Sequence, residues 1–287
     1  MDTFLHWWQH LPEQMNPVLF QIGEFRIQYY GLMYLVAFTL TYILSLWRIR
    51  HEKQRFQMNS ETLLNLTTAL VLGLVIGARL GYVVFYNFSY YLDHPLEIIL
   101  PFQFSDGFHF TGITGMSYHG GLIGTVIAMI IFARSNKLDF FHATDLIVPC
   151  IPLGYTFGRI GNFINGELYG RVTELSIGMY FPFSPGLERR HPSQLYEAFF
   201  EGIVLFGVLW AIKGRVKTTG AMLAFYLMGY GLVRFFIEYT REPDAHLGFV
   251  FLSFSMGQVL CMAMILSGGL LLGFFWRQQR VSGKQTS

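Results

Sequence analysis

Residues 143–167, ATDLIVPCIPLGYTFGRIGNFINGE, decide the fold class, because an apolar run there ends in a cluster of polar side chains. A transmembrane helix needs about 20 consecutive, mostly apolar residues, and residues 143–161 form such a run. Arg159 lies near its end and is the only basic residue in it. Charged side chains at membrane depth are costly and usually serve a function. The stretch therefore predicts a membrane-spanning helix that carries part of a polar site.

The composition of the whole chain agrees with a membrane protein. Of its 287 residues 53% are hydrophobic and 13% are charged, with a mean hydropathy of +0.40, whereas about a quarter of the residues in soluble domains are charged. Apolar runs of spanning length recur along the chain, which predicts an all-α polytopic membrane protein with seven transmembrane helices. The predicted spans are residues 29–47, 62–86, 118–133, 143–161, 195–212, 220–239 and 255–276.

The lysines predict how the chain is oriented. Every lysine lies in one of the four segments that follow the first, third, fifth and seventh spans, and positively charged loops stay in the cytoplasm. The N-terminus is therefore expected outside, in the periplasm, and the C-terminus inside. The predicted parts are an interfacial arm (1–28), a seven-helix catalytic domain (29–276) and a cytoplasmic tail (277–287), with external loops 87–117, 162–194 and 240–254 that form a small external head region.

The basic residues outside the cytoplasmic segments are all arginines. They are Arg26, Arg79, Arg159, Arg171, Arg189, Arg190, Arg234 and Arg241. The planar guanidinium binds a phosphate or carboxylate through two parallel hydrogen bonds, which is a reason to use arginine and not lysine. The alternative, that arginines at outer helix ends extend to the interface, is expected for Arg171, Arg189 and Arg190.

Two helical stretches place arginine beside other polar groups. In residues 158–167, GRIGNFINGE, Arg159 and Asn162 share one helical face. In residues 229–242, GYGLVRFFIEYTRE, Arg234 and Glu238 are four positions apart. An ion pair between these two that only neutralises itself is the alternative, but arginine before glutamate is the less favourable order. This favours an Arg234 that faces a ligand, with Glu238 orienting it.

His119 is a further candidate, at the outer entrance to a span in residues 115–124, GMSYHGGLIG. Histidine is a side chain that commonly acts as an acid or base near neutral pH, and free N–H groups at a helix start favour anions. A hydrogen-bonded structural histidine is the alternative, although the glycine pair that follows indicates close approach of a ligand or of another backbone. A weaker candidate is Arg79, which lies in the second predicted span. Asp145 is expected to be a helix cap or a structural partner and not a site residue.

Other chemistries find no support in the sequence. It has no Walker loop, dinucleotide fingerprint, HExxH or Gly-x-Ser-x-Gly motif. Cys150 and Cys261 lie within predicted spans and show no metal or disulfide spacing. We therefore expect no cofactor, no metal and no nucleic-acid partner.

Five stretches, in this order and spacing, resemble the bacterial phosphatidylglycerol–prolipoprotein diacylglyceryl transferase family. They are YYGLMYL, SYHGGLIG, GRIGNFINGELYGR, RHPSQLYE and GYGLVRFFIEYTREPDA. The resemblance implies a multi-pass enzyme of the bacterial inner membrane with an active site toward the periplasm. Such an enzyme moves the sn-1,2-diacylglyceryl group of phosphatidylglycerol to the lipobox cysteine of a preprolipoprotein signal peptide. The products are a thioether and glycerol 1-phosphate, and this is the first step of lipoprotein maturation.

On this resemblance His119, Arg159 and Arg234 are expected to be catalytic. The two arginines would stabilise the charge on the leaving phosphate, and His119 would accept the thiol proton, unless the electropositive site activates the thiol without a base. The expected substrate-binding residues are Tyr30, Asn162, Asn165, Gly166, Glu167, Glu197, Tyr230, Glu238 and Arg241.

Two other functions use similar residues. A transporter or channel for an anionic solute also places arginines and broken helices in the membrane, but here the polar groups gather on one side and no inverted repeat is visible. A lipid-binding scaffold without catalysis is the second alternative.

Overall fold

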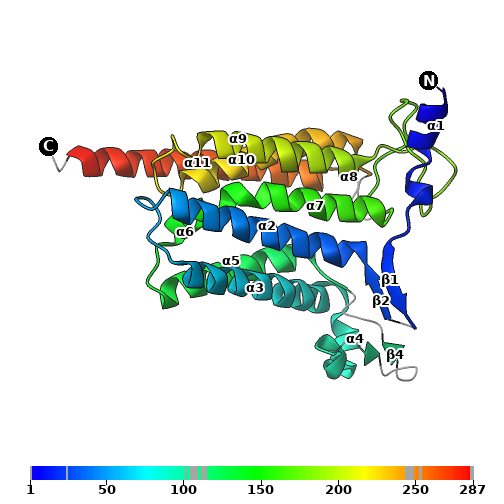
Figure 1. Cartoon of the computed structure of the whole chain (residues 1–287), viewed down its shortest axis with the longest axis horizontal. Coiled ribbons are helices and arrows are strands. Elements are labelled where there is room, and N and C mark those ends of the chain that lie inside the picture. Colours follow the sequence, from blue (N-terminus) through cyan, green and yellow to red (C-terminus); the bar gives the residue numbers. More distant parts are fainter. Residues whose placement is uncertain are drawn as a thin grey trace. The chain divides into compact units, whose positions relative to one another are not determined.

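The structure is a computed structural model, and most of the chain in it is helical (Figure 1). It describes residues 2–23, 25–100, 102–103, 109–110, 115–242, 249–251 and 254–284. Parts of the predicted external loops 87–117 and 240–254, and the end of the predicted tail 277–287, lie outside these residues. The chain forms two compact units, Met1–His51 with Thr144–Ser287, and Glu52–Ala143. Since strands occur in the described residues only as short antiparallel pairs, the predicted helical class is confirmed.

The unit formed by Met1–His51 and Thr144–Ser287 holds most of the elements. Its helices are α1 (Asp2–Gln9), η1 (Pro12–Gln14), α2 (Tyr29–His51), η3 (Val148–Cys150), α7 (Ile151–Ile164), α8 (Ser193–Tyr196), the π-helix η4 (Glu197–Val204), α9 (Leu205–Ile212), α10 (Ala221–Ile237), η5 (Glu238–Thr240) and α11 (Met256–Lys284). Its strand pairs are β1 (Val18–Ile22) with β2 (Phe25–Gln28), and β5 (Phe249–Phe251) with β6 (Phe254–Ser255).

The unit Glu52–Ala143 is built around two long helices. Its elements are α3 (Ser60–Tyr86), α4 (Phe88–Asp93), η2 (Pro95–Ile98), β3 (Phe102–Gln103), β4 (His109–Phe110) and α5 (Tyr118–Ser135). The helix α6 (Phe140–Ile147) crosses the boundary between the units.

Six helices of the described residues are long and apolar enough to cross a membrane. They are Tyr29–His51, Ser60–Tyr86, Tyr118–Ser135, Ser193–Ile212, Ala221–Thr240 and Met256–Gln279. The remaining predicted span, 143–161, occurs as the three successive pieces α6, η3 and α7. Pro149 and Pro152 lie at the starts of η3 and α7, where a proline is tolerated. In the interior of one continuous α-helix each would remove a hydrogen bond and cause a break. Several helices of membrane-spanning length are thus present in the described residues, and the predicted count of seven spans stays a prediction.

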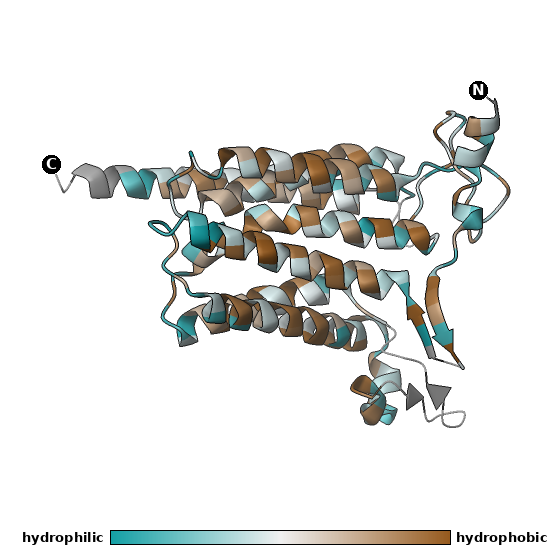
Figure 2. Ribbon diagram, viewed as in Figure 1, coloured by the Kyte–Doolittle hydropathy of each residue, from teal (hydrophilic) through white to brown (hydrophobic). Residues whose placement is uncertain are grey.

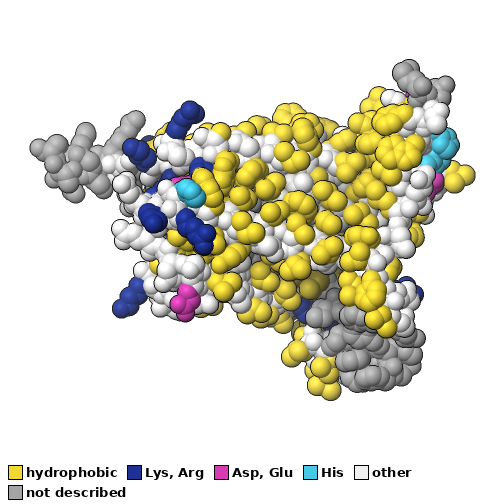
Figure 3. Space-filling model, viewed as in Figure 1, with side chains coloured by type: hydrophobic (Ala, Val, Ile, Leu, Met, Phe, Trp, Pro, Cys, Tyr) yellow, Lys and Arg dark blue, Asp and Glu magenta, His cyan; other side chains and the backbone are white. Residues whose placement is uncertain are grey.

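The outer surfaces of these helices are apolar, as a lipid environment requires. Figure 2 shows hydrophobic residues along α2 and α9, and Figure 3 shows how many hydrophobic side chains reach the molecular surface. On α11 the side chain of Leu270 is 76% exposed. Large exposed apolar surfaces of this kind mark contact with lipid or a partner.

A buried cluster joins the end of α2 to the start of α10. Arg48 has no exposed surface, and its Nη1 donates to the backbone oxygens of Asp145 and Leu146 at 2.5 and 2.6 Å. The carboxylate of Asp145 accepts hydrogen bonds from the backbone nitrogens of Gly220 and Met222 at 2.8 and 3.1 Å. These are the otherwise free donors at the start of a helix, so the structural role predicted for Asp145 is confirmed.

Glycines bring α3 and α5 into backbone contact. A Cβ atom on Gly120 would lie 2.3 Å from the carbonyl oxygen of Gly77, and one on Gly124 would lie 2.1 Å from that of Gly73. Small residues at this spacing allow membrane helices to pack closely. The sequence indicated that a ligand or another backbone approaches the glycine pair after His119. For Gly120 it is the backbone of α3 that approaches.

The predicted N-terminal arm folds onto the segment that follows α7. Trp8 Nε1 donates to the carbonyl oxygen of Ile177 at 3.1 Å. The backbone nitrogen of Tyr180 donates to the carbonyl oxygen of Gln9 at 2.8 Å. Phe163, Met179 and Phe181 form a buried apolar cluster, against which Trp8, Leu11, Met15, Tyr169 and Leu195 pack. Contact of the arm with a membrane surface stays a prediction.

Candidate active site

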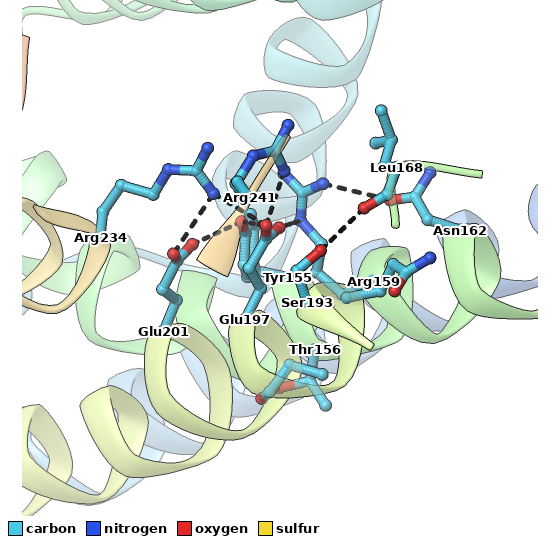
Figure 4. Close-up of polar contacts among 12 residues, drawn as sticks. Tyr155, Thr156, Arg159, Asn162, Leu168, Ser193, Glu197, Glu201, Arg234 and Arg241 are labelled. Atoms are coloured by element: carbon cyan, nitrogen blue, oxygen red, sulfur yellow. Dashed lines mark hydrogen bonds and ion pairs between the residues drawn. The ribbon is translucent and has the colours of Figure 1, made fainter. Parts of the chain in front are cut away.

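The carboxylate of Glu197 is the centre of a buried ionic network, and its side chain has no exposed surface. Arg159 Nε lies 2.8 Å from Oε2, Arg234 Nη1 lies 2.9 Å from Oε1, and Arg241 Nη1 lies 2.6 Å from Oε1. Figure 4 shows the three guanidinium groups converging on this carboxylate. A buried carboxylate is stable only when several donors compensate its lost hydration, and here three cations do so.

Three stretches distant in sequence supply these side chains: α7, η4, and α10 with the residues that follow it. Arg159 lies in the last turns of α7, Arg234 lies in the last turn of α10, and Arg241 follows η5 directly. Glu197 is the first residue of η4, an eight-residue π-helix between α8 and α9. Such π-helical segments are rare and occur frequently at functional sites.

Glu238 continues the network on the side of α10. Its Oε2 lies 2.8 Å from Arg234 Nη2 and 3.8 Å from Arg241 Nε, while Ser255 Oγ donates to Oε1 at 3.1 Å. The Arg234–Glu238 ion pair that the sequence offered as an alternative is therefore present. Both terminal nitrogens of Arg234 engage carboxylates of the protein, and a ligand-facing role for Arg234 stays a prediction.

The end of α7 folds the polar motif back on itself. Gly166 has a φ of +68°, which a glycine adopts at little cost, and its nitrogen donates to the oxygen of Phe163 at 3.0 Å. The nitrogen of Glu167 donates to the oxygen of Asn162 at 3.1 Å. This pair of bonds is the Schellman ending of a helix, so the backbone alone accounts for Gly166.

This reversal brings together residues that the sequence selected. Asn162 Nδ2 donates to Glu167 Oε1 at 2.8 Å, and Asn165 Nδ2 reaches the same oxygen at 3.4 Å. Arg159 Nη1 donates to Asn162 Oδ1 at 3.3 Å, which confirms that these two side chains share a helical face. Arg159, Asn162 and Glu167 thus form one polar chain, whose role in binding a substrate stays a prediction.

The segment before η4 holds the turn after α7 in place. Ser193 Oγ donates to the oxygen of Leu168 at 2.9 Å, and Gln194 Nε2 donates to that of Glu167 at 2.6 Å. Leu168 has a φ of +58°, a conformation that costs a non-glycine residue about 1 kcal/mol or more and that clusters near functional sites. The two hydrogen bonds stabilise this strained turn.

Three tyrosines line the network. A Cβ atom on Gly161 would lie 3.1 Å from Tyr30 Cδ2, so the absent side chain makes room for the Tyr30 ring. The guanidinium carbon of Arg159 lies 4.7 Å from the centre of the Tyr155 ring, a favourable cation–π distance. Tyr155 in turn packs edge-on against Tyr230 at 6.0 Å. The structure therefore places Tyr230 beside the network through Tyr155.

Tyr155 and Glu201 belong to this network and were missed from the sequence. Tyr155 donates from its hydroxyl to Glu201 Oε2 at 2.5 Å. Tyr155 lies in an apolar run that gives no signal, but Glu201 is a second carboxylate within the predicted span 195–212. A search for every charge at membrane depth would have found it.

Of the three outer arginines for which an interfacial role is expected, only Arg190 is buried, and for Arg171 and Arg189 this role stays a prediction. Arg190 is 6% exposed, and its Nη1 lies 2.7 Å from Glu242 Oε2. Arg171 Nε donates to the backbone oxygen of Arg241 at 2.6 Å. Arg189 donates to the oxygen of Glu174 at 3.1 Å. Arg171 and Arg190 join the segment after α7 to the one after η5, whereas Arg189 bonds within the first of these segments. A loop without its own helical bonds needs such donors for its carbonyls.

His119 lies in the unit Glu52–Ala143. It is in the first turn of α5, whose N-cap Ser117 accepts a hydrogen bond from the nitrogen of Gly120 at 3.2 Å, and its side chain is exposed. The arginine network lies in the other unit, so a catalytic role for His119 stays a prediction. In the described part of the chain no three or more His, Cys, Asp or Glu side chains are placed to hold a metal ion.

Helices long and apolar enough to cross a membrane, together with a buried arginine–glutamate network, characterise a multi-pass membrane protein. Residues 17–274 match the family of prolipoprotein diacylglyceryl transferases. A phosphatidylglycerol–prolipoprotein diacylglyceryl transferase of Chlorobaculum tepidum is 55% identical over 282 residues, which cover 98% of this chain and 96% of that protein. Proteins of the same name from Bordetella avium and Methylobacillus flagellatus are 48% and 44% identical, each over 90% of this chain and over 94% and 96% of their own lengths.

The chain therefore belongs to the prolipoprotein diacylglyceryl transferase family. It is a transferase of lipoprotein biosynthesis with several membrane-spanning helices.

Proposed function

We propose that this enzyme transfers the sn-1,2-diacylglyceryl group of phosphatidylglycerol to the lipobox cysteine of a preprolipoprotein. The sulfur–carbon bond forms at C3 of the lipid glycerol as the C3–oxygen bond breaks, and the bonding electrons leave on the phosphate of glycerol 1-phosphate. The names of its relatives support these substrates. The observation that carries the proposal is the convergence of three arginines on Glu197, because this reaction needs positive charge at a leaving phosphate.

Arg159 and Arg241 are the groups proposed to contact the phosphate directly. Arg159 uses Nε and Nη1 within the protein, and Arg241 uses Nη1 and Nε. Among the described residues neither Nη2 atom has a hydrogen-bond partner, and the two side chains are 16% and 18% exposed. Arg234 adds its charge from a position already bound to Glu197 and Glu238. One donor aimed at developing charge is worth about 3–4 kcal/mol in a transition state.

Glu197 has a positioning role in this proposal. Without it the three guanidinium groups would repel one another and turn toward water. Held by one carboxylate, they are oriented before the lipid arrives, so little reorganisation is needed as charge develops. Asn162, Asn165 and Glu167 would bind the headgroup or the peptide backbone, and Tyr30 and Tyr230 the glycerol and ester oxygens.

The thiol supplies the nucleophile and must lose its proton. A free cysteine has a pKa of about 8.5, so only a few per cent is thiolate at neutral pH. His119 is proposed as the base that accepts this proton. Its exposed imidazole at the start of α5 is compatible with contact to a substrate.

We also propose that α6, η3 and α7 together make the seventh span, which places the N-terminus in the periplasm and the C-terminus in the cytoplasm. α2 ends with Arg48, Arg50 and His51, and basic residues of this kind stay on the cytoplasmic side. Arg159 and Arg241 lie at the opposite helix ends, which supports an active site toward the outer face of the inner membrane.

The test is transfer by the purified protein in nanodiscs that contain radiolabelled phosphatidylglycerol. With a lipobox peptide the proposal predicts labelled peptide and free glycerol phosphate, and a peptide with serine in place of cysteine gives neither. Lipid binding without transfer would identify a scaffold, and anion flux across vesicles without transfer would identify a transporter. Either result overturns the proposal.

A further inference from the structure

The first turn of α11 lies against the carboxylate of Glu238. Ser255 Oγ donates to Glu238 Oε1 at 3.1 Å, and both residues are buried. A Cβ atom on Gly257 would lie 2.7 Å from Glu238 Cδ and closer still to Oε1, which is nearer than real Cβ atoms come to other atoms. The carboxylate therefore occupies the space that a side chain on Gly257 would need.

A capping box fixes the direction of the Ser255 hydroxyl. Ser255 directly precedes α11, and its Oγ accepts from the backbone nitrogen of Gln258 at 3.2 Å. Gln258 Oε1 in turn accepts from the backbone nitrogen of Ser255 at 3.1 Å. This reciprocal pair of bonds is typical of a helix start. Because the oxygen serves as the acceptor for Gln258, the single hydrogen of the hydroxyl is left for Glu238.

The capping box does not explain the glycine that lies inside it. Gly257 is not among the glycines with a positive φ, so its backbone conformation suits other residues, and alanine stabilises a helix more than glycine does. Close packing of two backbones, which explains Gly120, is not the reason either. The three atoms nearest to a Cβ on Gly257 all belong to the carboxylate of Glu238, so the glycine makes room for this group.

The same carboxylate contacts two arginines of the network. Glu238 Oε2 lies 2.8 Å from Arg234 Nη2 and 3.8 Å from Arg241 Nε, while Oε1 is bound to Ser255. One oxygen thus faces the arginines and the other faces the start of α11. The first N–H groups of a helix have no partner within the helix and favour a nearby anion, so this position stabilises the carboxylate.

We propose that Ser255 and Gly257, at the start of α11, are positioning residues that hold Glu238 and through it orient Arg234 and Arg241 for transfer. This inference rests on the proposed function for the role of the two arginines. Ser255 supplies the hydrogen bond that fixes one carboxylate oxygen, and Gly257 supplies the space. Both act through Glu238 and not on the substrate.

The first test is a double-mutant cycle on the transfer reaction. Gly257→Ala is expected to lower kcat of the folded enzyme by about tenfold or more, because the displaced carboxylate leaves the arginines out of place. In Glu238→Ala the space is empty, so adding Gly257→Ala is expected to cause no further loss. Gly269→Ala, on the same helix with nothing within 4 Å, is the matched control and leaves kcat unchanged.

Ser255→Ala tests the same contact without adding an atom. It is expected to lower kcat, and Ser255→Thr, which keeps a hydroxyl, is expected to restore part of the loss. An unchanged kcat in both Gly257→Ala and Ser255→Ala overturns the proposal. A loss from Gly257→Ala that is equally large with and without Glu238 overturns it too, since a structural defect in α11 would act in both proteins.

The second test needs no substrate. Solid-state NMR can measure dipolar couplings between ¹³Cδ of labelled glutamates and ¹⁵N of labelled arginine side chains, and Glu238→Ala identifies the couplings that belong to Glu238. We expect these couplings to weaken in Gly257→Ala and to stay in Gly269→Ala. Unchanged couplings in Gly257→Ala overturn the proposal. If even the wild type transfers no lipid, the proposed function fails, while the couplings still decide whether the start of α11 positions Glu238.

Discussion

Two buried arginine sites in the same unit differ in what their guanidinium groups bind. Arg48 donates to backbone oxygens of Asp145 and Leu146 and has no exposed surface. Arg159, Arg234 and Arg241 share carboxylates, and each side chain is 15–18% exposed. The Arg48 site is closed, because its side chain has no exposed surface, whereas the partly exposed guanidinium groups of the network leave room for an anion to join. A charge at membrane depth is thus a reason to look at its partners before a function is assigned.

The largest expected effect separates these two sites directly. Arg159→Ala is expected to lower the rate of lipid transfer by about 10²–10³-fold, because it removes a donor at the leaving phosphate. Arg159→Lys is expected to retain little activity, since an ammonium lacks the planar fork. The measurement is labelled peptide formed per folded enzyme. Near-normal transfer by folded Arg159→Ala would remove the phosphate site from the network.

The second prediction concerns stability at the other site. Asp145→Ala is expected to lower the free energy of unfolding by about 2–4 kcal/mol, because two buried nitrogens at the start of α10 lose their acceptor. Asp139→Ala, which removes one exposed bond to the nitrogen of His142, is the control and costs about 1 kcal/mol. Thermal unfolding midpoints compare the two variants. Equal midpoints would show that Asp145 is not the structural anchor of this region.

The third prediction tests the contact between α7 and η4. A Cβ atom on Gly202 would lie 2.0 Å from Thr156 Oγ1, so Gly202→Ala is expected to separate Glu197 from Arg159 at a cost of about 1–3 kcal/mol. Thr156→Ala in the same protein restores part of the lost transfer rate. Gly207→Ala, where nothing lies within 4 Å, is the control and leaves the rate unchanged. Equal transfer rates for Gly202→Ala and Gly207→Ala would contradict the close packing of Gly202 against Thr156.

The smallest effect is expected at the edge of the network. Arg190 and Glu242 form an ion pair at 2.7 Å, but Glu242 is 53% exposed. Such pairs are worth about 1 kcal/mol or less, so Glu242→Gln is expected to shift the unfolding midpoint only slightly and to spare transfer. A loss of transfer as large as that of Arg159→Ala would extend the active site to this pair.

The sequence predicted the parts of the molecule that local patterns control. Apolar runs located six continuous spans, and helical spacing placed Arg159 beside Asn162. It could not predict that Glu197 holds three arginines. Arg234 and Arg241, for example, lie 37 and 44 positions from Glu197 along the chain and meet it only in the fold. The π-helix was equally out of reach, since its extra residue per turn shifts Glu197 and Glu201 from α-helical register.

The proposed transfer requires direct contact between the arginine network and a lipid phosphate. Solid-state NMR can measure the dipolar coupling between the ³¹P of bound phosphatidylglycerol and ¹⁵N-labelled arginine side chains. We predict short-range couplings that weaken in Arg159→Lys, since Arg241 still contacts the phosphate, that are lost when Arg241→Lys is added, and that are kept in Arg48→Lys. Couplings that survive unchanged in the double variant, or the absence of any arginine–phosphorus coupling with lipid bound, would contradict the proposed contact.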